Sequence, residues 1–242
     1  MAAAQEKVDQ ISAEKTQKKD DARITEKLND FLQKNRKVLF LGLVAVVVIL
    51  AALIIGLTVR EKLLTSAFSK VDALNERYEE LLPFIGSEDS EAASKQADIS
   101  ALLEDINAFA SRNSGFAAAR AYSLSAGIYE LQKNWAESEK AWTLAAKAAE
   151  KNYLAPVSLY NAAVAAEEQG NIEAAIALYT RSLSFENSFS GAARAQFNIG
   201  RLQESRNNRE AALEAYRSLL GKWPNDQLWA NLAQSRIIQL AD

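Results

Sequence analysis

The hydrophobic pattern contains one long apolar run near the N-terminus. Residues 38–59 read VLFLGLVAVVVILAALIIGLTV, a run with no charged side chain, in which Thr58 is the polar residue. A helix of this length spans about 33 Å, which is enough for a bilayer hydrocarbon core of about 30 Å. A core helix of a soluble protein rarely runs so far without a charge. The run therefore predicts a transmembrane helix over residues 38–59.

The residues on either side of this run predict an anchor that is not cleaved. Its 37 preceding residues, and Arg60-Glu61-Lys62 after it, do not fit the short start and small-residue cleavage site of a signal peptide. Residues 23–37 hold five basic side chains, whereas residues 60–74 hold three. Because the more basic flank stays in the cytoplasm, we expect a cytoplasmic N-terminus and an external C-terminal part.

The first 37 residues are expected to form a charged cytoplasmic tail. Its outer half is too polar to build a core, so it should be solvated, either as disordered chain or as a frayed helix. Its inner half places four apolar residues at helical spacing: Ile24, Leu28, Phe31 and Leu32. This stripe fits the membrane surface or a partner, and it also fits a simple interfacial extension of the anchor helix.

A pattern with a period of 37 residues recurs three times in the C-terminal half. Each copy has a small residue, an acid, an asparagine, a second small residue and an aromatic, at constant spacing. The copies are Ala126, Glu130, Asn134, Ser138 and Trp142; Ala163, Glu167, Asn171, Ala175 and Tyr179; and Gly200, Glu204, Asn208, Ala212 and Tyr216. Such a period indicates a solenoid, in which each unit buries its apolar face against its neighbours.

The spacing has a physical meaning within each unit. Small residues let two helices approach closely. Asparagine tolerates left-handed backbone and can cap the following helix, so it marks a turn between two helices. The aromatic on the second helix is expected to fill the gap to the next pair. The alternative for the acids is that they only interact electrostatically with the turn.

The three copies resemble the tetratricopeptide repeat family, whose 34-residue motif has small, Ala and aromatic positions at this spacing. The resemblance covers about 110 residues, best in LYNAAVAAEEQGNIEAAIALYTRSLSFEN. The longer period implies extended connections, and Gln196 stands where the motif has a large apolar residue. The expected fold is all-α: a single transmembrane helix followed by a tetratricopeptide-like solenoid of helical hairpins.

This fold implies four parts. They are the tail (1–37), the transmembrane helix (38–59), membrane-proximal helices forming a degenerate first hairpin (60–112), and three repeats with a C-terminal capping helix (113–242). Within the third part, we expect one helix from residue 61 to residue 82 and another over about 96–109, separated by Pro83 and a polar stretch. The capping helix is expected over residues 226–240.

Composition excludes several kinds of chemistry. The chain has 28 Lys and Arg, 31 Asp and Glu, a net charge of −3, and neither His nor Cys. There is thus no Ser-His-Asp triad, thiol nucleophile or ordinary zinc site, and we find no phosphate-binding glycine motif. We expect no enzyme activity, no cofactor, no metal, no small-molecule substrate and no nucleic-acid partner.

The resemblance instead implies a groove that binds a peptide or a protein partner, because the first helix of each repeat lines the concave surface in that family. The residues at the corresponding positions are Arg120, Glu130, Tyr160, Val164, Glu167, Arg194, Phe197, Arg201 and Glu204. Tyr160, Val164 and Phe197 are expected to form an apolar strip beside the arginines, whose donors suit carbonyls or acidic side chains. The alternative is that these are ordinary packed or solvated helix faces.

Two further features bear on partners. Ala52-x-x-x-Gly56 is a small-xxx-small pattern that permits close packing between membrane helices.

The order of parts, with DFLQKNRKVLFLGLV at the anchor and INAFASRNSGFAAARAYSLSAGIYELQKNWAESEKAW after it, resembles the YfgM-type ancillary subunits of the bacterial Sec translocon. This resemblance implies a bacterial inner-membrane protein with a periplasmic domain, whose partners are the lipid bilayer, translocon components, exported clients and periplasmic chaperones.

Two other functions remain open from the sequence. The same surfaces could serve a structural scaffold in envelope biogenesis or cell division, with one folded partner. They could also serve a receptor of opposite topology that faces the cytosol. All three are non-enzymatic and differ in partner or orientation.

Overall fold

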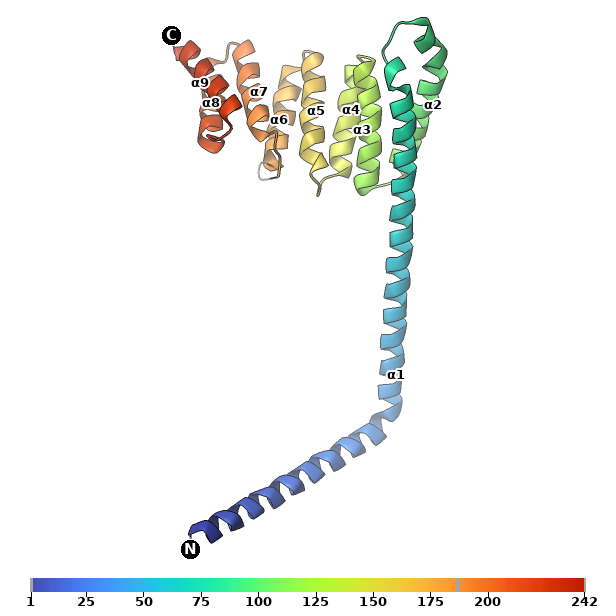
Figure 1. Ribbon diagram of the computed structural model, residues 1–242, viewed down its shortest axis with the longest axis vertical. Helices are drawn as coiled ribbons and strands as arrows, with labels where there is room; N and C mark the ends of the chain where they lie inside the picture. Colours follow the sequence, from blue (N-terminus) through green and yellow to red (C-terminus); the bar gives the residue numbers. More distant parts are fainter. Residues whose placement is uncertain (1, 186–187, 242) are drawn as a thin grey trace. The chain divides into compact units, whose positions relative to one another are not determined.

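The computed structural model describes the backbone of residues 2–185 and 188–241, and the side chains of residue 23 and of residues 25–185 and 188–241. Within these ranges every regular element is a helix (Figure 1). In chain order the elements are α1 (Ala2–Leu81), η1 (Leu82–Phe84), α2 (Ser90–Arg112), α3 (Gly115–Leu131), α4 (Trp135–Ala148), α5 (Leu154–Glu168), α6 (Ile172–Ser182), η2 (Leu183–Phe185), α7 (Ala192–Ser205), α8 (Arg209–Lys222) and α9 (Gln227–Ala241).

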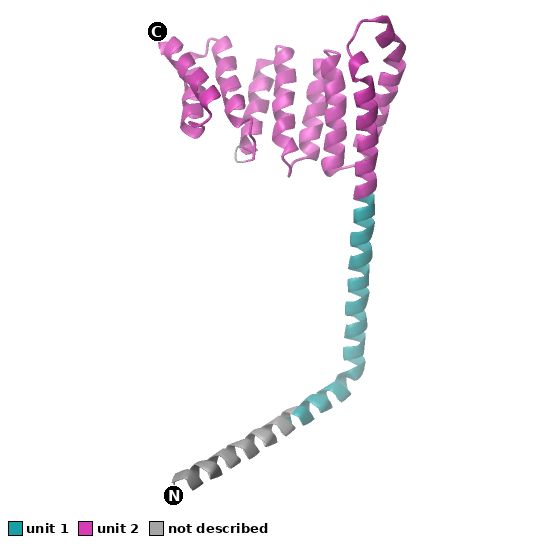
Figure 2. Cartoon of the chain, viewed as in Figure 1, with its two compact units in different colours: residues 1–63 teal, residues 64–242 magenta. Residues whose placement is uncertain are grey.

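Two compact units divide the chain, Met1–Leu63 and Leu64–Asp242 (Figure 2). The first unit is part of the long helix α1 and holds the apolar run. An 18-residue window of this run has a mean hydropathy of 3.4, and none of it is buried. A long apolar helix with exposed side chains is compatible with a single-pass membrane anchor.

The apolar stripe of the tail is exposed where the structure describes it. Leu28 and Phe31 each expose 55% of their surface, and Leu32 exposes 44%. The side chain of Ile24 lies outside the described residues, as do the side chains of the charged outer half of the tail.

The second unit begins with a small core made by the end of α1 together with α2 and α3. Its buried residues include Val71 of α1, Ile99, Leu102 and Ile106 of α2, and Ile128 of α3. These side chains follow helical spacing, so each helix turns one apolar stripe inward. The helices expected to be membrane-proximal thus share a compact unit with the repeats.

Helix α2 is longer than the sequence pattern predicts. It begins at Ser90, six residues before the expected start, because Asp89 caps it: Asp89 Oδ1 accepts a hydrogen bond of 2.6 Å from the backbone N–H of Ala92. Ala92 is also buried, at 3% exposure. The polar stretch that was expected to separate two helices therefore supplies the first turn of the second one.

Helices α3 to α8 form three antiparallel hairpins, α3–α4, α5–α6 and α7–α8. Each helix packs on the next one in the sequence, and Figure 1 shows them side by side in chain order. Helix α9 covers the last hairpin, where Ala230 and Ala233 pack with Tyr216 and Leu219 of α8. We call α3, α5 and α7 the A helices, and α4, α6 and α8 the B helices.

The three hairpin turns have one geometry. In each turn the asparagine that precedes the B helix donates its backbone N–H to the carbonyl five residues earlier: Asn134 to Tyr129, Asn171 to Ala166, and Asn208 to Gln203, at 2.8–2.9 Å. This is the bond of a Schellman C-cap, which satisfies a carbonyl at the end of the A helix.

The left-handed residue in these turns is not the repeated asparagine itself. It is the residue before it: Lys133 (φ 56°), Gly170 (φ 73°) and Asn207 (φ 58°). The asparagine instead has a negative φ and begins the B helix, and Asn171 and Asn208 accept a side-chain cap bond from the third residue beyond. In these turns the left-handed backbone and the cap of the B helix thus belong to two adjacent residues.

Gln196, the departure from the repeat pattern, is 9% exposed and lies inside the third hairpin. Its Nε2 donates a hydrogen bond of 3.1 Å to the carbonyl of Ala215 on α8. A buried amide is tolerated when it is hydrogen-bonded, so this bond explains how a polar residue replaces a large apolar one.

Candidate protein-binding face

The side chains predicted to bind a partner lie on the A helices, and we call them together the A-helix face. They are Arg120 and Glu130 of α3, Tyr160, Val164 and Glu167 of α5, and Arg194, Phe197, Arg201 and Glu204 of α7. The fold brings some of these side chains together, and others already contact residues of the same chain.

The three glutamates have a common role that the sequence pattern did not reveal. Each accepts a hydrogen bond from the B-helix aromatic twelve residues later: Glu130 from Trp142 (2.7 Å), Glu167 from Tyr179 (3.4 Å) and Glu204 from Tyr216 (3.0 Å). The carboxylate therefore ties the end of each A helix to the middle of its own B helix. This contact replaces the interpretation that the acids only interact with the turn.

Two of the glutamates also bind an arginine from the next helix of their face. Arg201 Nη2 of α7 donates to both carboxylate oxygens of Glu167, at 2.6 and 2.7 Å. Arg236 of α9 pairs with Glu204 through two nitrogens, with Nε donating to Oε2 at 3.1 Å and Nη2 donating to Oε1. Such charge-assisted bonds are stronger than neutral ones. Here they join the second hairpin to the third, and the third hairpin to the capping helix α9.

Tyr160 contributes less accessible surface than expected. It is 8% exposed, and its ring packs against Tyr179 at 5.1 Å and Phe189 at 6.1 Å between ring centroids. Its hydroxyl accepts a hydrogen bond of 3.1 Å from Asn198 Nδ2. The expectation of an open apolar strip that includes Tyr160 therefore needs correction: this ring is part of the core, because Phe189 from the α6–α7 connection covers it.

The α7 end of the face keeps an accessible aromatic and cationic surface. Phe197 is half-buried between Tyr216 and Trp229, with each ring centroid at 5.4 Å. The exposed Arg194 places its Cζ 5.2 Å from the centroid of Tyr160 and 5.9 Å from that of Trp229. Cation–π contacts of this kind hold the guanidinium in place while its donors stay available. Trp229 belongs to the capping helix and was not among the predicted residues.

The other arginines are not free donors. Arg120 Nη1 pairs with Asp72 Oδ1 of α1 at 2.7 Å, and Arg201 is bound by Glu167. Val164, between them along the face, is half-buried. A partner that used Arg120 or Arg201 would first have to displace an existing carboxylate.

Burial changes the acid–base behaviour of the aromatic donors. Burial, with the nearby Glu204 carboxylate, raises the pKa of Tyr216 to about 12. Burial, with Tyr160 and Glu167 close by, raises the pKa of Tyr179 as well. Both hydroxyls therefore stay protonated, and can donate to Glu167 and Glu204, at pH values above the ordinary tyrosine pKa as well.

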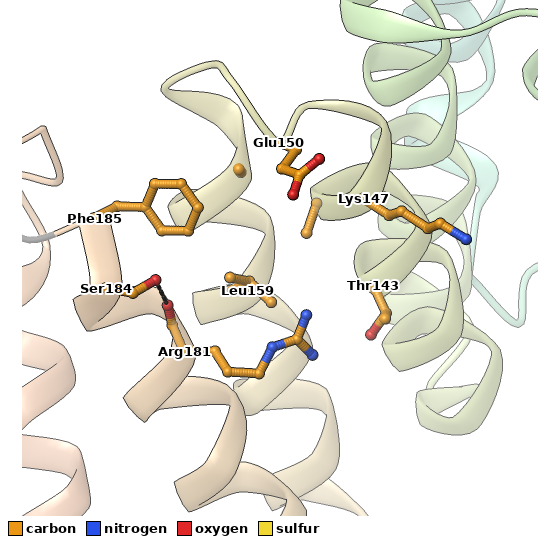
Figure 3. A pocket seen from close by; sticks show the side chains of 9 residues that line it. Thr143, Lys147, Glu150, Leu159, Arg181, Ser184 and Phe185 are labelled. Carbon is orange, nitrogen blue, oxygen red and sulfur yellow. Dashed lines mark hydrogen bonds between the residues drawn. The ribbon is translucent and has the colours of Figure 1, made fainter.

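A hollow of about 420 Å³ lies away from the predicted residues, between α4, α5 and the end of α6 (Figure 3). Leu159 and Phe185 give it an apolar part, and Lys147, Glu150 and Arg181 give it charged ones. The sequence pattern does not predict this hollow, because its residues come from three helices and the connections beside them and share no periodicity.

The small-xxx-small pattern of the first unit corresponds to a hollow on the surface of α1. Ala52 and Gly56 lie in a shallow apolar hollow on α1, together with Ile49, Leu53 and Leu57. A side chain on Gly56 would meet open space, so another helix could approach closely there.

Comparison with known families matches two of the three hairpins. A family model of the tetratricopeptide repeat matches residues 157–184, which include most of α5 and all of α6, and residues 194–226, which include most of α7 and all of α8. These two segments are thus similar to tetratricopeptide repeats. The first hairpin, α3–α4, lies outside the matched residues, although it has the same turn and the same glutamate–aromatic bond.

A relative from Treponema pallidum (strain Nichols) is described as a TPR repeat-containing protein. It is 39% identical over 97 residues, and the match spans 40% of this chain and 40% of the relative. The two proteins are thus alike over less than half their lengths. Tetratricopeptide repeats are protein-interaction scaffolds, so protein partners are the general function that these comparisons support.

Proposed function

We propose that this protein is a membrane-anchored, non-enzymatic adaptor that holds exported or envelope proteins near the Sec translocon. The observation that carries the proposal is the pairing, in one chain, of tetratricopeptide repeats with an apolar helical run whose side chains are all exposed. An exposed run of this hydropathy is stable in lipid and not in water. Tethering then raises the local concentration of the repeats at the membrane.

In this proposal the A-helix face receives an extended segment of the client. Phe197 and Val164 offer apolar contact, while Arg194 offers donors for backbone carbonyls or acidic side chains. Periplasmic chaperones and translocon components are further partners. Ala52 and Gly56 are the proposed packing site for a membrane helix of such a component.

The proposed location is the bacterial inner membrane, with the N-terminus in the cytoplasm and the repeats in the periplasm. The excess of basic residues before residue 38 supports this orientation. Because the chain has no cysteine, single cysteines can test it. In intact spheroplasts, a membrane-impermeant maleimide should label Ser100→Cys of α2 and should not label Lys27→Cys of the tail. Labelling of Lys27→Cys alone would favour a cytosol-facing receptor.

The partner class is tested by gentle solubilisation and affinity purification of the full chain. Translocon subunits or exported chains should co-purify, and a variant with Val47→Lys, which places a charge in the middle of the apolar run, should lose both the membrane fraction and these partners. A matched Val47→Leu variant should keep them. Recovery of cell-division or wall-assembly proteins in place of exported chains would instead support a structural scaffold.

A further inference from the structure

Within the described ranges, a glutamate–arginine pair occurs in the second and third hairpins of the A-helix face but not in the first. Arg201 follows Glu167 by 34 residues, and Arg236 follows Glu204 by 32 residues. Each arginine comes from the next helix of the face and closes over a glutamate that already holds its own B-helix aromatic. The residue 34 positions after Glu130 is Val164, which has no charge. The first hairpin therefore presents the same glutamate without its arginine.

The hydrogen bonds of Glu130 show the same difference at the level of atoms. Trp142 Nε1 and Ser138 Oγ both donate to its Oε1, at 2.7 and 3.4 Å. In the part of the chain that the structure describes, Oε2 has no hydrogen-bond or ion-pair partner. In Glu167, by contrast, Arg201 binds both oxygens. One oxygen of Glu130 is thus held in position by the fold, and the other is free to accept.

The surroundings favour a cation at this oxygen. Glu130 is half-buried, and burial, together with the nearby carboxylates of Glu79 and Glu130, raises the pKa of Tyr78 on α1. A partly desolvated carboxylate gains more from a cation than an exposed one does. Val164 adds an apolar surface that the methylene groups of a long basic side chain can cover.

We propose that Glu130 and Val164 form a receiving site for an arginine side chain of the bound protein. The guanidinium would take the place that Arg201 and Arg236 occupy in the other two hairpins, with its methylenes against Val164. Arginine fits better than lysine, because its planar fork can bind a carboxylate through two donors. This inference rests on the proposed function and gives the bound segment one chemical requirement, a basic residue at the first hairpin.

The direct test measures how the full chain in detergent binds two fluorescent peptides, by anisotropy. The peptides are extended, capped at both ends and identical apart from a central arginine or its neutral analogue citrulline. The arginine peptide should bind about tenfold more tightly, which corresponds to one charge-assisted hydrogen bond. Equal affinities would overturn the arginine site while leaving peptide binding by the repeats intact. Failure of both peptides to bind would overturn the site and the peptide-binding function together.

Two substitutions locate the preference. Glu130→Gln should remove it, because the amide keeps the shape of the side chain and loses its charge. Glu168→Gln, a matched change at an exposed glutamate of α5, should keep it. If Glu130→Gln retained the tenfold preference, the site would lie elsewhere.

A third substitution tests whether an arginine at position 164 can pair with Glu130. Val164→Arg supplies the missing guanidinium from within the chain, so it should raise the unfolding temperature and abolish the preference for the arginine peptide. Ala177→Arg, which adds the same charge at an exposed position of α6, should do neither. The gain from Val164→Arg should disappear when Glu130→Gln is also present. A Val164→Arg variant that folds and still prefers arginine would contradict the proposal.

Discussion

Gly200 of α7 lies directly against the ring of Tyr216 of α8. A Cβ at Gly200 would stand 2.5 Å from Cε1 and 2.8 Å from Cδ1 of the ring, closer than such atoms approach in proteins. The ring cannot easily move away, because its hydroxyl is bonded to Glu204 at 3.0 Å. The small residue of the third repeat is therefore glycine for a steric reason.

We predict that Gly200→Ala destabilises the protein by about 1 kcal/mol. Alanine gains about 1 kcal/mol in helix propensity, but overpacking costs about 1–3 kcal/mol. Chemical unfolding followed by circular dichroism in detergent would measure the difference. The control is Gly221→Ala, in α8, where a Cβ meets open space. That variant should gain about 0.5–1 kcal/mol, and a gain at Gly200 as well would show that the ring gives way.

The Glu167–Arg201 pair should couple the second and third hairpins. A double-mutant cycle with Glu167→Ala and Arg201→Ala is expected to give a coupling energy of about 1 kcal/mol, the upper end for partly exposed pairs. Glu167→Ala also removes the hydrogen bond between Glu167 and Tyr179. Because this bond is lost with and without Arg201→Ala, its energy does not enter the coupling energy. The coupling should fall as salt is added.

The matched control for that cycle is the more exposed pair of Arg206 and Glu173, whose N–O distance of 2.8 Å is similar. The side chain of Glu173 is 71% exposed, against 24% for Glu167. Its coupling should be near zero, since water screens both charges. Equal couplings in the two cycles would mean that burial of Glu167 contributes nothing.

Stability should fall in alkaline solution over a defined window. In the unfolded chain Tyr216 loses its proton near its ordinary pKa of 10, whereas in the folded protein it keeps the proton up to about pH 12. Between these values the folded state binds more protons, so the free energy of unfolding decreases as the pH rises. Thermal unfolding at a series of pH values would show this decrease.

A Tyr216→Phe variant provides the comparison for the alkaline series. It should be less stable at pH 7, because Glu204 loses a donor, and its stability should decline less between pH 10 and pH 12. A parallel decline in both proteins would show that Tyr216 does not contribute to the pH dependence.

Much of the fold follows from the sequence because the repeats are regular. The constant spacing of Asn134, Asn171 and Asn208 predicts where each hairpin turns, and the structure confirms an all-α arrangement of helical hairpins after a long apolar helix. The start of α2 was missed, because a cap such as Asp89 depends on one hydrogen bond and leaves no periodic signal.

The contacts of the A-helix face were predicted less well. The burial of Tyr160 depends on Phe189, which lies in a connection between helices and outside any repeat. The arginine pairs, in contrast, had a signal: Arg201 and Arg236 follow their glutamates at nearly one repeat motif's length. Opposite charges at that spacing can be sought in other repeat sequences.

The hydrogen bond from each B-helix aromatic to its glutamate spans only twelve residues of chain. Together with the turn that lies between them, this contact lets a hairpin close using residues that lie close together in the chain. Contacts between residues close in sequence form quickly, because little chain entropy is lost in making them. Each hairpin can thus close before it docks on its neighbour, and the closed hairpin offers a surface on which the next one assembles.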